Sequence, residues 1–194
     1  GKTLVTPFHM ALIASAIAND GVLMKPYVID SVQSTEGSVI EQYESENYGT
    51  LMSASESSQL TKMMKAVVEE GTGYKLSGKN YSVAGKTGTV GSDGEVKCQY
   101  FVGMTPEYIG AVWIGFDEGE ERLNLKNYLH VTQIWKNIFQ DISCEKTAFD
   151  RDSTVEKRMY CEKSGNLASQ SCENVQEGWY SVDNLPGICT ECGQ

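Results

Sequence analysis

The chain has 194 residues, of which 40% are hydrophobic, and this suits one domain with a sizeable core plus a short extension. Asp and Glu outnumber Lys and Arg by 26 to 16, giving a net charge of −10. This balance argues against a nucleic-acid partner, because phosphate backbones require clustered basic side chains. No apolar run approaches the roughly 20 residues of a membrane helix, and no signal peptide opens the chain.

The segment "TPFHMALIASAIANDG" predicts the first helix. Thr6 is a suitable N-cap, and Pro7 stands at the first helical position, where the missing N–H of proline costs nothing. Gly21 is a natural C-terminal stop. Because the body from Ala11 to Ala18 is small and apolar almost all round, we expect this helix to be deeply buried.

A hairpin and a second helix are expected next. The stretch "VLMKPYVIDSVQSTEGSVIEQYE" has β-forming residues on both sides of a turn at Thr35-Glu36-Gly37, which predicts a hairpin on the outside of the fold. Ser53 and Glu56 form a capping box that predicts a helix ending at Gly71. Five apolar residues recur at helical spacing in this segment: Leu60, Met63, Met64, Val67 and Val68. We expect the two methionines among them to fill the core.

Three β-forming segments follow: "YSVAGKTGTV", "CQYFVGMTP" and "YIGAVWIGF". The turns between them are short, so the strands should pair antiparallel. A third helix, roughly Leu125 to Ile142, has an apolar face that should pack across this sheet. Helices against an antiparallel sheet make an α+β fold. The periodicity then fades, so we predict a main domain over 1–142 and an irregular cysteine-rich extension over 143–194.

The segment "VAGKTGT" has two alternative interpretations, a phosphate-binding loop or an active-site strand. A phosphate loop requires G-x-x-x-x-G-K-[ST] and a following helix, but Asn80 occupies the position of the first glycine.

In a strand, Thr87 and Thr89 share one face, and their hydroxyls suit a carboxylate. Gly88 allows a ligand to approach the backbone, and Lys86 supplies a positive charge for an anionic ligand and for proton transfer. A free backbone N–H on such an edge strand can stabilise an oxyanion. The strand interpretation is favoured.

A lysine-threonine-glycine element occurs in penicillin-binding proteins and serine β-lactamases. Four segments resemble, in order, the transpeptidase domain of penicillin-binding proteins: "VTPFHMALIASAIANDGVLMKPYVI", "MMKAVVEEGTG", "VAGKTGT" and "QYFVGMTPEYIGAVWIGFDEG". The resemblance implies peptidoglycan cross-linking by a serine D,D-transpeptidase. In such an enzyme a serine attacks the D-Ala-D-Ala bond of a stem peptide, forms an acyl-enzyme and passes the acyl group to an amine. It also implies that β-lactams acylate this serine, that Lys86 is catalytic, and that Thr87, Gly88 and Thr89 bind substrate.

Of the family's motifs S-x-x-K, S-x-N and K-T-G, only the third is in its expected place. "SCEK" (143–146) follows K-T-G instead of preceding it, and "SEN" (45–47) lies after the hairpin, so we interpret both as chance matches. We therefore expect an upstream half of the same protein to supply the serine and a membrane anchor, on the outer face of the bacterial cytoplasmic membrane. The isolated chain should be inactive and should expose apolar surface where the missing nucleophile helix would pack.

Five of the six cysteines lie in roughly the last quarter of the chain: Cys144, Cys161, Cys172, Cys189 and Cys192. Such a tail is stapled by disulfides in an exported protein or binds metal in a cytosolic one. The last two have zinc-knuckle spacing, but the gap between Cys161 and Cys172 is too long for a knuckle. We favour disulfides of unassigned pairing and predict no metal and no other cofactor. Cys98 is predicted to be a buried free thiol, and His9 and His130 to be structural.

The alternatives fall into two classes. A degenerate transpeptidase-like module would bind cell-wall peptide or a partner without catalysis, and the absence of an upstream S-x-x-K would favour it. A monofunctional transpeptidase or a β-lactamase would share K-T-G, but a β-lactamase explains the first helix and the long tail less well. The tail segments "YCEKSGNLASQSCENV" and "LPGIC" resemble the extension of bifunctional penicillin-binding proteins, which carry a glycosyltransferase domain upstream.

Overall fold

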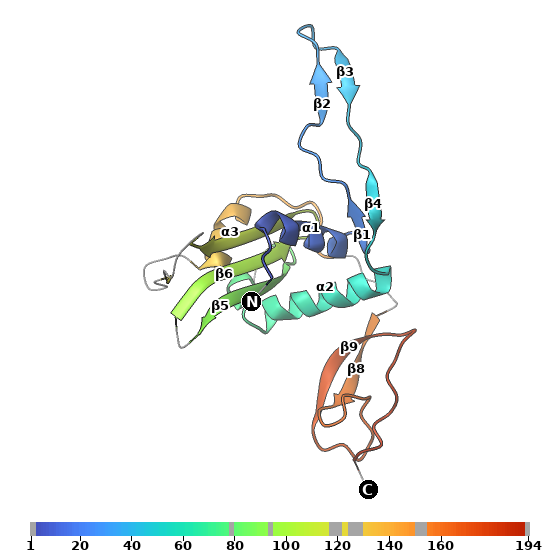
Figure 1. The fold of residues 1–194 in the computed structure, drawn as a ribbon. Coiled ribbons are helices and arrows are strands. Elements are labelled where there is room, and N and C mark those ends of the chain that lie inside the picture. Colours follow the sequence, from blue (N-terminus) through green and yellow to red (C-terminus); the bar gives the residue numbers. More distant parts are fainter. Residues whose placement is uncertain are drawn as a thin grey trace.

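The computed structural model describes residues 3–77, 80–92, 95–116, 122–123, 130–149 and 155–192. At its centre is a three-stranded antiparallel sheet with the order β5-β6-β7, formed by Ala84–Ser92, Glu95–Met104 and Ile109–Gly115. The register pairs Lys86 with Val102 and Thr87 with Phe101. The α+β fold and the antiparallel pairing are therefore confirmed, and β5 is an edge strand of this sheet (Figure 1).

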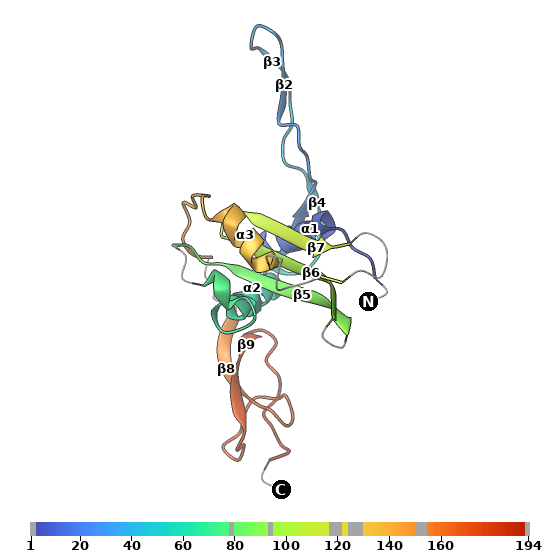
Figure 2. The same cartoon turned by 90° about the vertical axis from the view of Figure 1, so that its left-hand side faces the viewer.

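Helix α3, Val131–Phe139, covers one face of the sheet (Figure 2). Trp135 is fully buried there. Its ring stacks on Phe139 with 3.9 Å between centroids and meets the edge of Phe101 at 5.6 Å. The indole N–H donates to the carbonyl of Gly110 over 3.2 Å, so the helix is fixed in register on β7. The helix is shorter than the predicted span of 125–142, and residues 125–129 of that span lie outside the described residues.

Helix α1, Pro7–Ala18, packs toward the sheet through Ala14, Ala16 and Ile17. The predicted N-cap is confirmed, because the backbone N–H of His9 donates to the Thr6 hydroxyl over 3.1 Å. The predicted deep burial is wrong. Large side chains of the helix are open to solvent, with Phe8 60% and Ile13 44% exposed, and Leu4 in the segment before it is 95% exposed. Only one side of this all-round apolar helix has a partner within the described part of the chain.

Helix α2, Ala54–Glu69, runs along the β5 side of the sheet (Figure 1). Its predicted capping box is confirmed: Glu56 accepts from the Ser53 backbone N–H over 2.8 Å, and Ser53 accepts from the Glu56 backbone N–H. Val68 is buried and Met64 packs against a core of Ile17, Ala84 and Met104, but Met63 is 48% exposed. The prediction that Met63 fills the core is wrong. A short 3-10 turn, η1 (Tyr74–Leu76), follows the helix.

The predicted external hairpin is confirmed and is long (Figure 1). It has a basal pair, β1 (Val22–Met24) with β4 (Asn47–Thr50), and a distal pair, β2 (Ser31–Gln33) with β3 (Val39–Gln42). Gly37 adopts the left-handed φ of +84° at the tip, a conformation that glycine adopts without strain.

The first residues of the tail still contact the sheet and the segment leading into it. Beyond α3, the Cys144 sulfur lies 3.6 Å from the Thr105 hydroxyl, and the Ser82 backbone N–H donates to the Thr147 carbonyl over 2.8 Å. Strands β8 (Val155–Cys161) and β9 (Val175–Ser181) then form a separate hairpin beside α2, seen in red and orange in Figure 1. The domain boundary at 143 stays a prediction. No helix among the described residues is long and apolar enough to cross a membrane.

Candidate active-site strand

The four residues Lys86 to Thr89 lie in the middle of the edge strand β5. Lys86 is exposed, and its ammonium group donates to the Thr87 carbonyl over 2.8 Å. Thr89 is exposed and Thr87 is half-buried. Because β5 pairs with β6 on one side only, its other backbone edge carries no strand in the described sheet. This edge therefore has the hydrogen-bonding groups that an added strand or an extended ligand uses.

A turn after α2 fixes the Thr87 side chain. Gly71, Thr72 and Gly73 form this turn, and the hydroxyl oxygens of Thr72 and Thr87 lie 2.8 Å apart. Thr72 was not among the predicted site residues, although it belongs to the segment "MMKAVVEEGTG", which resembles the transpeptidase family. Alternation along β5 places Thr87 and Thr89 on one face, as predicted, and Lys86 and Gly88 on the other.

Two aromatic residues support the neighbouring strands behind this segment. Tyr100 pairs with Gly88 across the sheet, and its ring lies 6.4 Å from that of Trp113 on β7. The Tyr100 hydroxyl donates to the Val5 carbonyl over 2.7 Å, which ties β6 to the segment leading into α1. Burial, and secondarily the charge of Cys98, raises the pKa of Tyr100. Cys98 itself is half-buried, so the prediction of a buried thiol is wrong.

The two serines of the displaced motifs lie elsewhere. Ser143 adjoins Cys144, whose sulfur contacts the Thr105 hydroxyl. Thr105 follows Met104, which pairs with Ala84 at the start of β5. Thr105 therefore lies beside a point about three residues, or roughly 10 Å of strand, before Lys86. Ser45 lies in the external hairpin, where its neighbour Glu46 is paired with Lys25 at 3.0 Å. These contacts do not bring either serine to the lysine-threonine-glycine segment.

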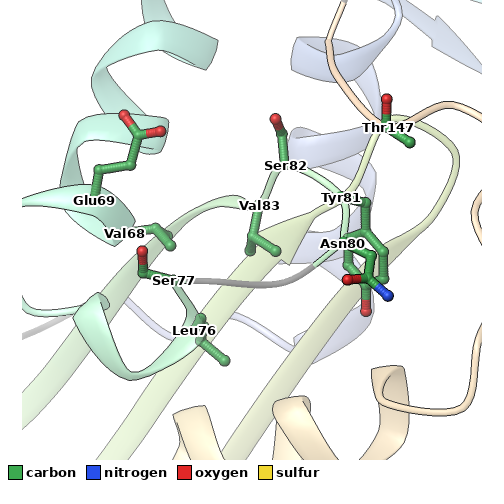
Figure 3. Close-up of a pocket in the computed structure, with 9 residues that line it drawn as sticks. All are labelled: Val68, Glu69, Leu76, Ser77, Asn80, Tyr81, Ser82, Val83 and Thr147. Atoms are coloured by element: carbon green, nitrogen blue, oxygen red, sulfur yellow. The ribbon is translucent and has the colours of Figure 1, made fainter.

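A small hollow lies at the start of β5 (Figure 3). It has a volume of about 200 Å³, and Leu76, Tyr81, Ser82 and Val83 are among its lining residues. Figure 3 shows Glu69 of α2 on one side and Thr147 on the other. The hollow does not include residues 86–89, so it is separate from the candidate site.

The structure also gathers four cysteines of the tail, Cys161, Cys172, Cys189 and Cys192, whose sulfur atoms all lie within 4.8 Å of one another. None is in a disulfide. Hydrogen bonds lower the pKa of Cys161 to about 6, the backbone of Ser164 contributing most, and the shared contact with Cys161 raises that of Cys192 to about 12. These are the only residues that form such a cluster in the part of the chain that the structure describes.

A family model described as the penicillin binding protein transpeptidase domain matches residues 1–140, which include the whole of the central sheet and α3. The chain belongs to this family. Penicillin-binding protein 1A/1B of Bacillus subtilis is 29% identical over 190 residues, which are 90% of this chain and 20% of that protein. The chain therefore spans about a fifth of the length of this relative.

Two solved structures are similar to the chain. The D,D-transpeptidase domain of a peptidoglycan glycosyltransferase from Eggerthella lenta is 33% identical with a TM-score of 0.53, over 60% of this chain and 28% of that one. Penicillin-binding protein 1A from Haemophilus influenzae covers 94% of this chain and 33% of that one, with a TM-score of 0.69 at 17% identity. The second likeness includes part of the tail, because it covers 94% of the chain, and it concerns the fold alone.

Proposed function

We propose that this chain forms one wall of the active site of a serine D,D-transpeptidase that cross-links peptidoglycan. In this proposal Lys86 acts in proton transfer, and the hydroxyls of Thr87 and Thr89 hold the carboxylate of a D-Ala-D-Ala stem peptide or of a β-lactam. Gly88 leaves room for the ligand at the backbone. The observation that carries the proposal is the exposure of Lys86 and Thr89 on the edge strand β5, with Thr87 between them hydrogen-bonded to Thr72.

The chemistry requires a nucleophilic serine that faces this edge. Neither Ser45 nor Ser143 adjoins it, so we propose that a serine outside residues 1–194 attacks the substrate. The exposed apolar side chains of Leu4, Phe8 and Ile13 support this assignment, because they offer a surface on which a further helix would pack. We further propose a bifunctional protein on the outer face of the cytoplasmic membrane, with its anchor and glycosyltransferase domain upstream and with a main domain ending near 142.

Covalent labelling with a fluorescent penicillin tests the proposal. Residues 1–194 alone and the full-length protein are incubated with the probe and separated on a denaturing gel. We expect label only on the full-length protein, and proteolysis should place it outside residues 1–194. Label on the chain alone would mean that the nucleophile lies within it, with Ser143 the first to substitute. No label on either sample would favour the non-catalytic module.

Substitutions then test the individual roles in the full-length protein. Lys86→Gln should slow acylation by about 100-fold or more, because proton transfer by a positioned group contributes on that scale. Lys97→Gln is the matched control, since this lysine is exposed on the neighbouring strand β6. Thr89→Val should raise the penicillin concentration needed for half-maximal labelling. Equal labelling rates for Lys86→Gln and Lys97→Gln would remove Lys86 from the mechanism.

A further inference from the structure

The tail holds a second site, away from β5, formed by three separate segments of chain. Cys161 ends strand β8, Cys172 lies in the loop between β8 and β9, and Cys189 and Cys192 follow β9. Their sulfur atoms form one group with no separation greater than 4.8 Å, and two of the four residues, Cys161 and Cys189, are buried. Residues far apart in sequence are thus brought to one point by the fold of this hairpin.

The spacing of the sulfur atoms matches a tetrahedral metal centre. With Zn–S bonds of about 2.3 Å, the edge of a regular tetrahedron of sulfur atoms is about 3.8 Å. The Cys161 and Cys192 sulfur atoms are 3.6 Å apart. A disulfide bond is about 2.05 Å long, so this pair is at the distance of two ligands of one ion and not at that of a bonded pair.

Backbone N–H groups surround the sulfur atoms in a repeated pattern. The backbones of Ser164 and Lys163 hydrogen-bond to the Cys161 sulfur. The backbones of Glu191 and Cys192 do the same for Cys189. In both cases the donors stand two and three residues after the cysteine, so the two loops hold their cysteines by the same pattern of contacts.

The third segment has a comparable contact. The backbone N–H and the hydroxyl of Ser169 both lie 3.3 Å from the Cys172 sulfur. Zinc binds thiolates, and hydrogen bonds from donors such as these stabilise their negative charge and orient them. The tail therefore already places hydrogen-bonding groups beside the sulfur atoms of Cys161, Cys172 and Cys189.

The loops around the cluster are joined by backbone hydrogen bonds, but few of their described side chains are buried. Leu167 bridges to the last segment, accepting from the Cys189 N–H over 2.7 Å and donating to the Gly187 carbonyl over 2.9 Å. Among the described residues from 155 to 192, only Val155, Cys161 and Cys189 are buried. Units of fewer than about 40 residues usually depend on disulfides or a metal for stability. The tail has the small core that makes such a crosslink necessary.

We propose that Cys161, Cys172, Cys189 and Cys192 bind a structural zinc ion that holds the tail together. Four thiolates in a tetrahedron suit zinc, with iron as the competing metal. On binding, the ion takes four sulfur ligands and the displaced thiol protons pass to solvent. The site has no open coordination position, so its role is structural and not catalytic. This proposal does not depend on the function of β5, and it replaces the disulfides favoured from sequence spacing.

The test uses the full-length protein, with all sequence flanking residues 1–194 retained, purified without chelator or added reductant. Elemental analysis should find about one zinc per chain that survives dialysis, as expected for a closed four-thiolate site. Mass spectrometry under non-reducing conditions should give the mass of the reduced tail. Absence of zinc with paired or free cysteines, or iron in its place, would overturn the proposal.

Variants separate the cluster from the other thiols. Cys189→Ser should lower the retained zinc at least tenfold, whereas Cys144→Ser, a cysteine outside the cluster, should retain it. Unchanged zinc in Cys189→Ser would overturn the assignment. Because Cys189→Ser alone can prevent folding, Cys192→His is added, since imidazole also binds zinc. It should retain zinc, and after exchange with Co²⁺ its visible absorption should show fewer thiolate ligands than the natural protein; an unchanged cobalt spectrum would count against the site.

Discussion

The hydroxyl oxygens of Thr72 and Thr87 lie 2.8 Å apart, joining the turn after α2 to the middle of β5. Thr87 is thereby held by a residue that does not itself belong to the strand. The position of the proposed carboxylate-binding hydroxyl is thus set by where α2 ends. Helix α2, the turn over 71–73 and β5 act as one unit in the proposed site.

Thr72→Val should therefore slow acylation by penicillin in the full-length protein. The variant removes one hydroxyl partner of Thr87, and a hydrogen bond contributes about 0.5–1.5 kcal/mol, or roughly two- to tenfold in rate. Thr72→Ser keeps the hydroxyl and should stay close to the natural rate. Thr35→Val, in the distal hairpin, is the control. If Thr72→Val and Thr72→Ser acylate equally fast, Thr72 does not position Thr87 for the reaction.

Gly110→Ala should destabilise the sheet–helix interface. A methyl group at this position would lie 2.6 Å from a ring carbon of Phe139 and 2.8 Å from the indole nitrogen of Trp135. Overpacking of this kind costs about 1–3 kcal/mol, so the midpoint of thermal unfolding should fall by several degrees. Gly187→Ala is the matched control, because no described atom lies within 4 Å of a methyl group there. Equal midpoints would mean that α3 shifts on the sheet without cost.

The sequence predicted correctly those features of the fold that depend only on residues close together along the chain. The capping box of Ser53 and Glu56 and the turn at Gly37 depend on neighbouring residues alone, and both were predicted correctly. The antiparallel pairing of the strand that contains Lys86 followed from the short turns between the three β-forming segments. The burial of α1 did not, because its sequence is apolar on all sides while only one side has a partner among the described residues.

The cysteine cluster could not be predicted for a different reason. Spacing rules recognise two ligands in one loop, such as Cys189 and Cys192. Cys161 and Cys172 are joined by a longer loop, and their approach depends on Leu167 binding to the segment before Cys189. Thr72 was missed similarly, since its role arises from how the turn after α2 packs on β5. Contacts between segments distant in sequence have no local signature.

The capping box gives the stability of α2 a dependence on pH. Hydrogen bonds from the Ser53 backbone and then its side chain lower the pKa of Glu56 from 4.5. A lowered folded-state pKa means that this stabilisation is complete above the unfolded value and is lost as the pH falls through the folded one. Glu56→Gln should therefore unfold at a lower temperature than the natural protein at pH 7, and this difference should shrink as the pH is lowered from 5 to about 3. Glu44→Gln, in the hairpin, is the control, and a pH-independent effect of Glu56→Gln would contradict the prediction.

The tail hairpin should be held on α2 partly by a cation–π contact. The Lys62 ammonium lies 4.8 Å from the centroid of the Trp179 ring and also donates to the Val155 carbonyl over 3.1 Å. Trp179→Leu and Lys62→Met, alone and together, form a double-mutant cycle. The free energy of local opening is measured by amide hydrogen exchange in β9 of the full-length protein.

The coupling energy between Trp179 and Lys62 should be about 0.5–1 kcal/mol, the size of a cation–π interaction near the surface. The matched control pairs Trp179→Leu with Lys65→Met, because Lys65 lines one pocket together with Lys62 and Trp179 but is paired with Glu69 at 3.3 Å. That cycle should give a coupling near zero. If both cycles give equal coupling, the lysine charge acts on the hairpin from a distance. If Lys62 shows none, Trp179 attaches the tail through apolar packing and the Gln59 hydrogen bond to its carbonyl over 3.0 Å.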